Sequence, residues 1–160
     1  MRIFDKTKLK PDCATCDAVC CAALKLPYAH YPKPARETCK NLDCATKQCT
    51  IFDKLESEGY SVCRKFDCYG AGPAVAQLFR GMGKNWMNDA TTADVQFNVY
   101  AIVYVTLLKY MRPEFKIDFD MPESEIEKLK PFTEAALQLL AETADPFADS
   151  SPAGSTGRPI

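Results

Sequence analysis

The sequence predicts a mainly α-helical protein in which a cysteine-rich N-terminal part, made of short helices and loops, packs on a small C-terminal helical bundle. Two observations lead to this fold class. All nine cysteines fall within the first 68 of the 160 residues, and apolar residues recur at helical spacing in the remainder. We therefore expect a cysteine-rich part at 1–72, a helical part of the same domain at 73–144, and a tail at 145–160. The tail is rich in Pro, Ser, Gly and Ala, and this composition is typical of disorder.

The cysteine-rich part is organised around the stretch CATCDAVCC, which begins at Cys13. Alanines and cysteines between 12 and 24 predict one short helix. In such a helix Cys13, Cys16 and Cys20 lie on one face, because positions i, i+3 and i+7 stack at 3.6 residues per turn. Cys21 then lies about 100° further round the helix, where it could reach a second centre.

Prolines and glycines divide the rest of this part. Three prolines make residues 26–37 a predicted loop, which contains His30, the single histidine of the chain. We interpret this histidine as a surface or packed residue rather than a metal ligand. Apolar residues at helical spacing follow between 49 and 60, with Gly59 placed as a C-terminal stop. Pro73, after two glycines, suits the start of a new helix.

Three helices are predicted in the C-terminal part. The first carries an apolar stripe formed by Val75, Leu78, Phe79 and Met82. The second opens at a capping box formed by Thr91 with Asp94 and runs to Met111. This segment is rich in valine and tyrosine and could form a strand, but its length of about 20 residues favours a helix buried on most sides. The third starts after Pro122 and contains Pro131, a position for a kink.

Composition and charge exclude several classes of protein. The formal net charge is −1, so the chain lacks the basic stripe that nucleic-acid binding requires. The longest apolar run, 99–108, is too short to cross a bilayer. The N-terminus has no apolar signal region. We therefore expect a cytoplasmic protein with no nucleic-acid or membrane partner.

The cysteine spacing indicates a metal site. Cytoplasmic thiols are kept reduced, and clustered cysteines there bind metal more often than they form structural disulfides. Cys13 and Cys16 have the spacing of a ligand knuckle, and both zinc and iron–sulfur clusters commonly take four cysteines. Binding would contribute to the folding free energy, because it ties the proline-rich loop to the helix. Further cysteines strengthen this hypothesis: Cys20, Cys21, Cys39, Cys49, Cys63 and Cys68.

The same residues resemble a known family. The CxxCxxxCC start, the Cys-x-Asn-Leu segment at 39–42, the Cys-x-Ile segment at 49–51, Cys63 and the FDCYGAG segment at 66–72 are similar to the cysteine-rich N-terminal domain of many actinobacterial pentapeptide-repeat proteins. More distantly they resemble the CxxCxxCC family of putative zinc- or iron-chelating proteins, to which flagellin lysine methylase is also similar. The closer resemblance reaches about residue 143.

The resemblance implies eight metal ligands and leaves Cys44 as a spare thiol. The ligands are Cys13, Cys16, Cys20, Cys21, Cys39, Cys49, Cys63 and Cys68. They divide into two four-cysteine sites, or into one cluster and four other thiols. Two features depart from the family: Phe52 stands where a histidine is frequent, and the pentapeptide repeats are missing.

Three functions remain as alternatives. The first is a metal-binding protein, with one or two zinc ions favoured, in a structural, sensing or metal-handling role. The second is an iron–sulfur protein, holding a [4Fe-4S] cluster, that acts as a redox or accessory component of an enzyme system. The third is a thiol-redox or copper(I)-binding protein. No catalytic constellation is visible, so we do not expect an independent enzyme, although a protein partner fits each alternative.

Overall fold

The computed structural model describes residues 4–25 and 32–142. Within them the chain is mainly helical, which confirms the predicted fold class. The α-helices are α1 (Val19–Ala23), α2 (Ser61–Lys65), α3 (Ala71–Gly81), α4 (Ala90–Met111) and α5 (Glu123–Glu142). Two short strands, β1 (Leu42–Asp43) and β2 (Gln48–Cys49), form an antiparallel hairpin, and 3₁₀ helices cover Lys6–Lys8, Cys13–Thr15 and Phe52–Lys54. His30 and the predicted tail lie outside the described residues.

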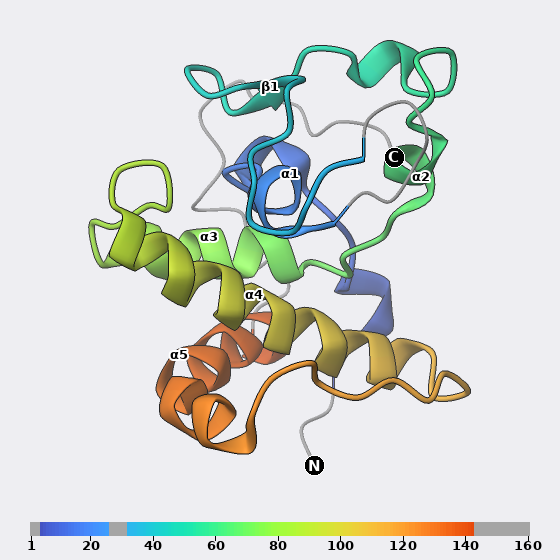
Figure 1. Cartoon of the computed structure of the whole chain (residues 1–160). Coiled ribbons are helices and arrows are strands. Elements are labelled where there is room, and N and C mark those ends of the chain that lie inside the picture. The colour runs from blue at the N-terminus through green and yellow to red at the C-terminus, as the bar shows by residue number, and fades with distance from the viewer. Residues whose placement is uncertain (1–3, 26–31, 143–160) are drawn as a thin grey trace.

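Helices α3, α4 and α5 pack against one another and form the helical part of the fold (Figure 1). Their shared core contains Val75 and Phe79 from α3, Val103 from α4 and Leu137 from α5, all buried. Phe79 also stacks on Phe132 of α5, with ring centroids 5.8 Å apart. The three predicted helices are therefore present, and burial of their apolar stripes holds them together.

Helix α4 is the long central helix, and it contacts α1 as well as α3 and α5. Its start differs from the prediction. The N-cap is Asp89, whose carboxylate accepts hydrogen bonds from the backbone N–H groups of Thr91 and Thr92. These bonds lower the pKa of Asp89, the hydroxyl and backbone of Thr92 contributing most. The N-cap is therefore Asp89 rather than the predicted Thr91, and the helix begins two residues earlier than predicted.

The predicted helix over 12–24 is wrong. The chain instead forms a 3₁₀ turn at Cys13–Thr15 and then α1, separated by Asp17 and Ala18, each with φ +56°. Two consecutive left-handed residues cannot continue a right-handed helix. The face shared by three cysteines of one helix is therefore absent, and these cysteines are placed by two short turns instead.

Two smaller predictions also need correction. Met82 is 42% exposed, because α3 ends at Gly81 and Met82 lies past its last turn. The expected helix between 49 and 60 is only a 3₁₀ turn at Phe52–Lys54, although Gly59 does have the positive φ, +88°, of a chain-reversing glycine. By contrast α5 runs through Pro131.

The cysteine-rich part lies on one side of the helical part. In Figure 1, α1 is enclosed between the β1–β2 hairpin and helices α3 and α4. Cys16 and Cys68 belong to the same buried cluster as the apolar residues of α3 and α4. The sulfur-bearing layer is therefore continuous with the core. None of the described helices is long and apolar enough to span a membrane.

Candidate metal centre

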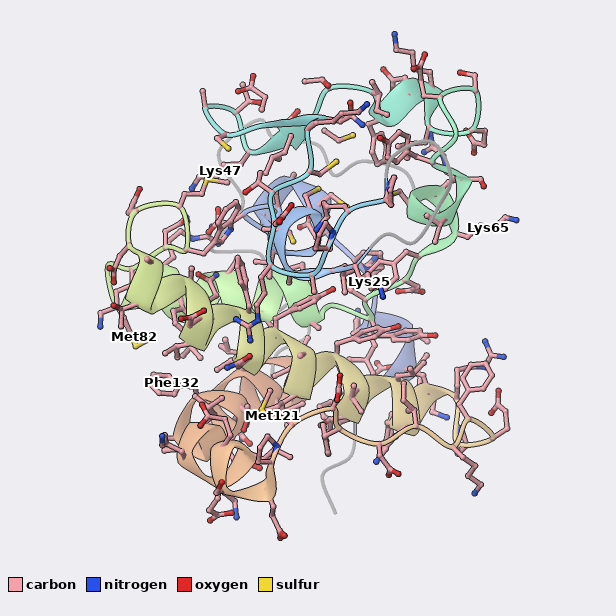
Figure 2. The ribbon with its side chains drawn as sticks, viewed as in Figure 1. Lys25, Lys47, Lys65, Met82, Met121 and Phe132 are labelled. Atoms are coloured by element: carbon pink, nitrogen blue, oxygen red, sulfur yellow. The ribbon has the colours of Figure 1, made fainter. Side chains whose placement is uncertain are left out.

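Eight of the nine cysteines line two cavities that share part of their walls. All nine lie in the described residues as thiols and none is joined in a disulfide. The smaller cavity, of about 50 Å³, is lined by Cys13, Cys16, Cys20, Cys63 and Cys68. The larger, of about 340 Å³, is lined by Cys13, Cys16, Cys20, Cys21, Cys39, Cys49 and Cys63. Figure 2 shows sulfur atoms gathered between α1 and β1, away from Met82 and Met121.

The ninth cysteine lies apart from the others. Cys44 is exposed in the turn that joins β1 to β2. Asp43 organises this turn, because its Oδ1 accepts a hydrogen bond of 2.9 Å from the N–H of Ala45. The eight cysteines that the resemblance selects thus line the two cavities, and Cys44, which it leaves out, is not among the residues that line them.

Cys16 and Cys68 pack against the first turn of α3, where Gly72 leaves room for them. A Cβ added at Gly72 would lie 2.6 Å from Cys16 Sγ and 3.9 Å from Cys68 Sγ. Burial raises the pKa of Cys68 to about 12, and Cys16 adds to the rise, whereas hydrogen bonds from the backbone of Gly72 and Gly70 oppose it. These backbone donors are the kind that stabilise a thiolate once its proton is lost.

We expect Gly72→Ala to destabilise the protein by roughly 1–3 kcal/mol, because the added methyl group overlaps the buried Cys16 sulfur. The matched control is Gly81→Ala at the other end of α3, where a Cβ meets nothing within 4 Å. That change should be neutral or slightly stabilising, since alanine favours helix over glycine. Chemical denaturation of both variants measures the difference, and equal stability would show that Cys16 moves aside without cost.

Cys20 connects the thiols of Cys16 and Cys21 through hydrogen bonds. Hydrogen bonds with the thiols of Cys16 and Cys21 are the largest causes that raise its pKa well above the ordinary value, and burial adds to them. A thiol in this environment is protonated at neutral pH in the metal-free protein. A thiophilic ion would have to displace that proton, so its binding would be favoured by rising pH.

Backbone hydrogen bonds hold a second group of thiols, which consists of Cys21, Cys39, Cys49 and Cys63. The N–H of Cys39 donates to the carbonyl of Cys21 at 2.8 Å. The N–H of Leu42 donates to Cys39 at 3.1 Å, and Leu42 pairs with Cys49 across the hairpin. Burial raises the pKa of Cys63 to about 11, with further increases from Cys21, Cys39 and Cys49. The hairpin, α1 and α2 thus each bring a cysteine to this place.

Lys33 is a buried cation beside the second group, and nothing in the sequence analysis pointed to it. The residue is 1% exposed. Its Nζ donates to three backbone carbonyls, at 2.6 Å to Glu37, 3.0 Å to Pro34 and 3.3 Å to Ala22. Burial lowers the pKa of Lys33, and the neighbouring Cys39 and Cys21 oppose that change. A lysine inside a proline-rich segment has no spacing or pattern that predicts burial.

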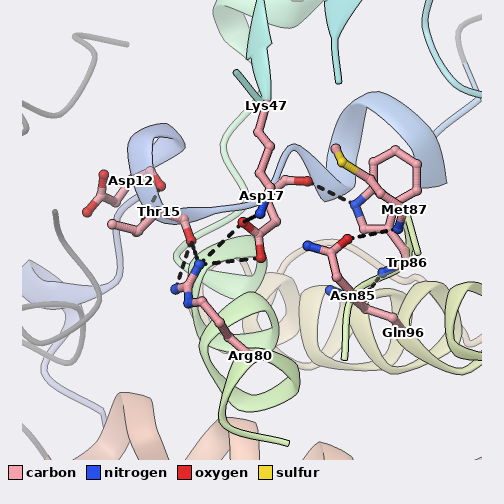
Figure 3. Close-up of polar contacts among 9 residues, drawn as sticks. All are labelled: Asp12, Thr15, Asp17, Lys47, Arg80, Asn85, Trp86, Met87 and Gln96. Atoms are coloured by element: carbon pink, nitrogen blue, oxygen red, sulfur yellow. Dashed lines mark hydrogen bonds and ion pairs between the residues drawn. The ribbon is translucent and has the colours of Figure 1, made fainter. Parts of the chain in front are cut away.

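Asp17 fixes the break between the two short turns that carry the first four cysteines. Its carboxylate, on a residue 6% exposed, pairs with Lys47 at 3.1 Å and Arg80 at 3.3 Å (Figure 3). Its carbonyl accepts a hydrogen bond of 2.9 Å from Nε1 of Trp86. Trp86 is therefore a core residue, and it ties the segment between α3 and α4 to the cysteine-rich part.

We expect Asp17→Ala to lower the free energy of unfolding by about 2 kcal/mol. It removes hydrogen bonds to two charged groups and places alanine at a left-handed φ. Asp17→Asn should cost about half as much, since asparagine tolerates this φ and keeps an acceptor. Denaturant unfolding at one fixed metal concentration compares the variants. An equal loss for both would mean that the carboxylate charge alone holds the break.

The arrangement of donors fits a thiophilic metal in its chemistry, although the thiols are not placed as a finished site. Among residues 4–25 and 32–142, no group of three or more His, Cys, Asp or Glu side chains is arranged to hold a metal ion. The cysteines that line the two cavities are not joined in disulfides, and a change of χ1 rotamer moves a cysteine sulfur without moving the backbone. Phe52, at the position where the family often has histidine, lines both cavities as an apolar ring.

Comparison with known proteins gives one relative. No family model matches the chain, and no solved structure matches it. Uncharacterized protein YybG of Bacillus subtilis (strain 168) is 33% identical over 144 residues, which represent 82% of this chain and 50% of that protein. The chain thus spans about half the length of the curated relative it matches.

Proposed function

We propose that this protein binds metal ions through the thiolates of its eight gathered cysteines, with zinc as the first candidate. The observation that carries the proposal is their convergence: segments as distant as 13–21 and 63–68 bring reduced thiols to shared cavities. Buried cysteines also serve as small apolar residues, but eight of them lining two adjoining cavities match the ligand number of two four-cysteine sites. Cys44 differs from these eight, because it is exposed and does not line either cavity.

The role that fits these ligands is structural, sensing or metal handling in the cytoplasm. Eight thiolates supply four ligands for each of two zinc ions, and a four-cysteine site leaves no coordination position for a substrate. We therefore propose a protein that is not an independent enzyme and whose partners are metal ions, with a further protein as recipient or target. The similarity to pentapeptide-repeat cysteine domains stays a prediction that agrees with this role.

An iron–sulfur cluster is the second candidate, and one observation favours it. Backbone N–H groups of Gly70 and Gly72 are directed at the buried Cys68 sulfur. Hydrogen bonds to sulfur and burial are among the features that tune cluster potentials. By contrast, a thiol-redox role is disfavoured, because reactive cysteines have lowered pKa values, whereas those of Cys39 and Cys63 are raised.

The test is metal analysis of protein purified anaerobically without added zinc, together with a visible spectrum. Stoichiometric zinc in colourless protein supports the first candidate, and absorption near 400 nm (roughly, iron–sulfur charge transfer) supports the second. Cys16→Ser and Cys63→Ser should each lower the metal content, whereas Cys44→Ser should not. Protein without bound metal that also fails to take up Zn²⁺ would overturn the proposal, and metal loss in Cys44→Ser would overturn the choice of ligands.

A further inference from the structure

The position of the Cys20–Cys21 pair suggests how the eight thiols are shared. These neighbours lie in α1, where successive side chains point about 100° apart. Cys20 hydrogen-bonds the thiols of both Cys16 and Cys21, while the backbone carbonyl of Cys21 accepts a bond from the N–H of Cys39. The pair is thus linked to Cys16 through Cys20 and to Cys39 through Cys21.

We propose that the thiols form two separate four-cysteine metal sites, which rests on the proposed function. Site A consists of Cys13, Cys16, Cys20 and Cys68. Site B consists of Cys21, Cys39, Cys49 and Cys63.

Site A lies at the N-terminal end of α3. All four of its cysteines line the smaller cavity, and two of them flank the position of the missing Cβ of Gly72. Tyr100 also lines this cavity: the residue is 1% exposed, its hydroxyl oxygen has no hydrogen-bond partner within the described part of the chain, and the thiols of Cys20, Cys68 and Cys16 act on that hydroxyl. A buried hydroxyl without a partner is costly, and a thiolate would be an acceptor for it. At site A the Tyr100 hydroxyl could therefore donate a hydrogen bond to a cysteine thiolate once metal is bound.

Site B lies between α1, the hairpin and α2. All four of its cysteines line the larger cavity, which Cys13, Cys16 and Cys20 of site A also line, and three of the four are absent from the smaller cavity. Cys63 also touches the smaller cavity, but the thiols that influence it are those of Cys21, Cys39 and Cys49. The buried Lys33 is on this side, next to Cys39 and Cys21. Four thiolates around a divalent ion carry a net charge of about −2, so a buried cation there is favourable. The two sites thus differ in their polar neighbours: site A has the neutral hydroxyl of Tyr100, whereas site B has the cationic ammonium group of Lys33.

The test uses Cd²⁺ added to metal-free protein and read by cadmium NMR, with pairs of substitutions as the design. The parent protein should give two thiolate-bound resonances. Cys68→Ser should remove one of them and Cys63→Ser the other. The double variant within site A, Cys13→Ser with Cys68→Ser, should still keep one resonance, whereas the double variant across the sites, Cys63→Ser with Cys68→Ser, should keep none.

Two further variants retain all eight thiols, so they test the division even if a serine variant does not fold. Tyr100→Phe should shift one of the two resonances and leave the other in place, and where Cys68→Ser folds the shifted resonance should be the one that it removes. The control, Cys44→Ser, should shift neither. Equal loss of both resonances in every single serine variant, or a shift of both in Tyr100→Phe, would indicate one shared cluster and overturn the division. Parent protein that binds no Cd²⁺ or Zn²⁺ would instead overturn the proposed function itself.

Discussion

A chelator that removes the proposed metal ions should open the cysteine-rich part of this protein and leave the helical part folded. Between 32 and 65 the regular structure consists of a hairpin whose two strands have two residues each, one 3₁₀ turn and the short helix α2. Most side chains between 43 and 59 are exposed or half-buried, so little apolar burial holds this segment. Structural zinc contributes about 10–16 kcal/mol of apparent binding free energy in small domains, which is folding free energy when the site does not exist in the unfolded chain.

Hydrogen exchange with and without chelator measures this effect. Amides of 39–68 should lose most of their protection, while α4 and α5 keep theirs, because their apolar faces are buried against each other independently of sulfur. Cys44→Ser is the control, and it should respond to chelator as the parent does. Equal protection of 39–68 in both conditions would mean that metal does not support this half of the fold.

The helical part could be predicted because its signal is local and long. The run from Ala90 to Met111 is too long for an ordinary strand and ends just before Pro113. A helix was therefore predicted correctly, although valine and tyrosine favour strands. The cap was misplaced by two residues, because Asp89 and Thr91 are both good N-caps and only the hydrogen bonds decide between them.

The cysteine-rich part could be predicted only in its composition. The break after Cys16 depends on Asp17 meeting Arg80, which is 63 residues away, and no short pattern carries such a contact. Likewise Gly72 matters because a sulfur from another segment approaches it. The resemblance selected eight of the nine thiols as expected ligands. How they gather required the tertiary structure.

Lys33→Met should destabilise the protein by about 3 kcal/mol. Methionine has a similar length but no donor, so the carbonyls that Lys33 Nζ now satisfies would lose this partner in a buried place. Each buried acceptor that loses its partner costs about 1–3 kcal/mol, and local rearrangement recovers part of the sum. The matched control is Lys65→Met on the exposed side of α2, which should change stability by no more than about 0.5 kcal/mol.

Repeating the Lys33→Met measurement with and without metal separates two roles of this lysine. If Lys33 only joins backbone segments, the loss of stability is the same in both states. If it also balances thiolates at Cys21 and Cys39, the loss is larger in the metal-bound protein, because a charge of opposite sign is removed from beside them. Denaturant unfolding of parent and variant in the two states decides between these outcomes. A variant as stable as the parent in both would show that the buried ammonium group contributes nothing.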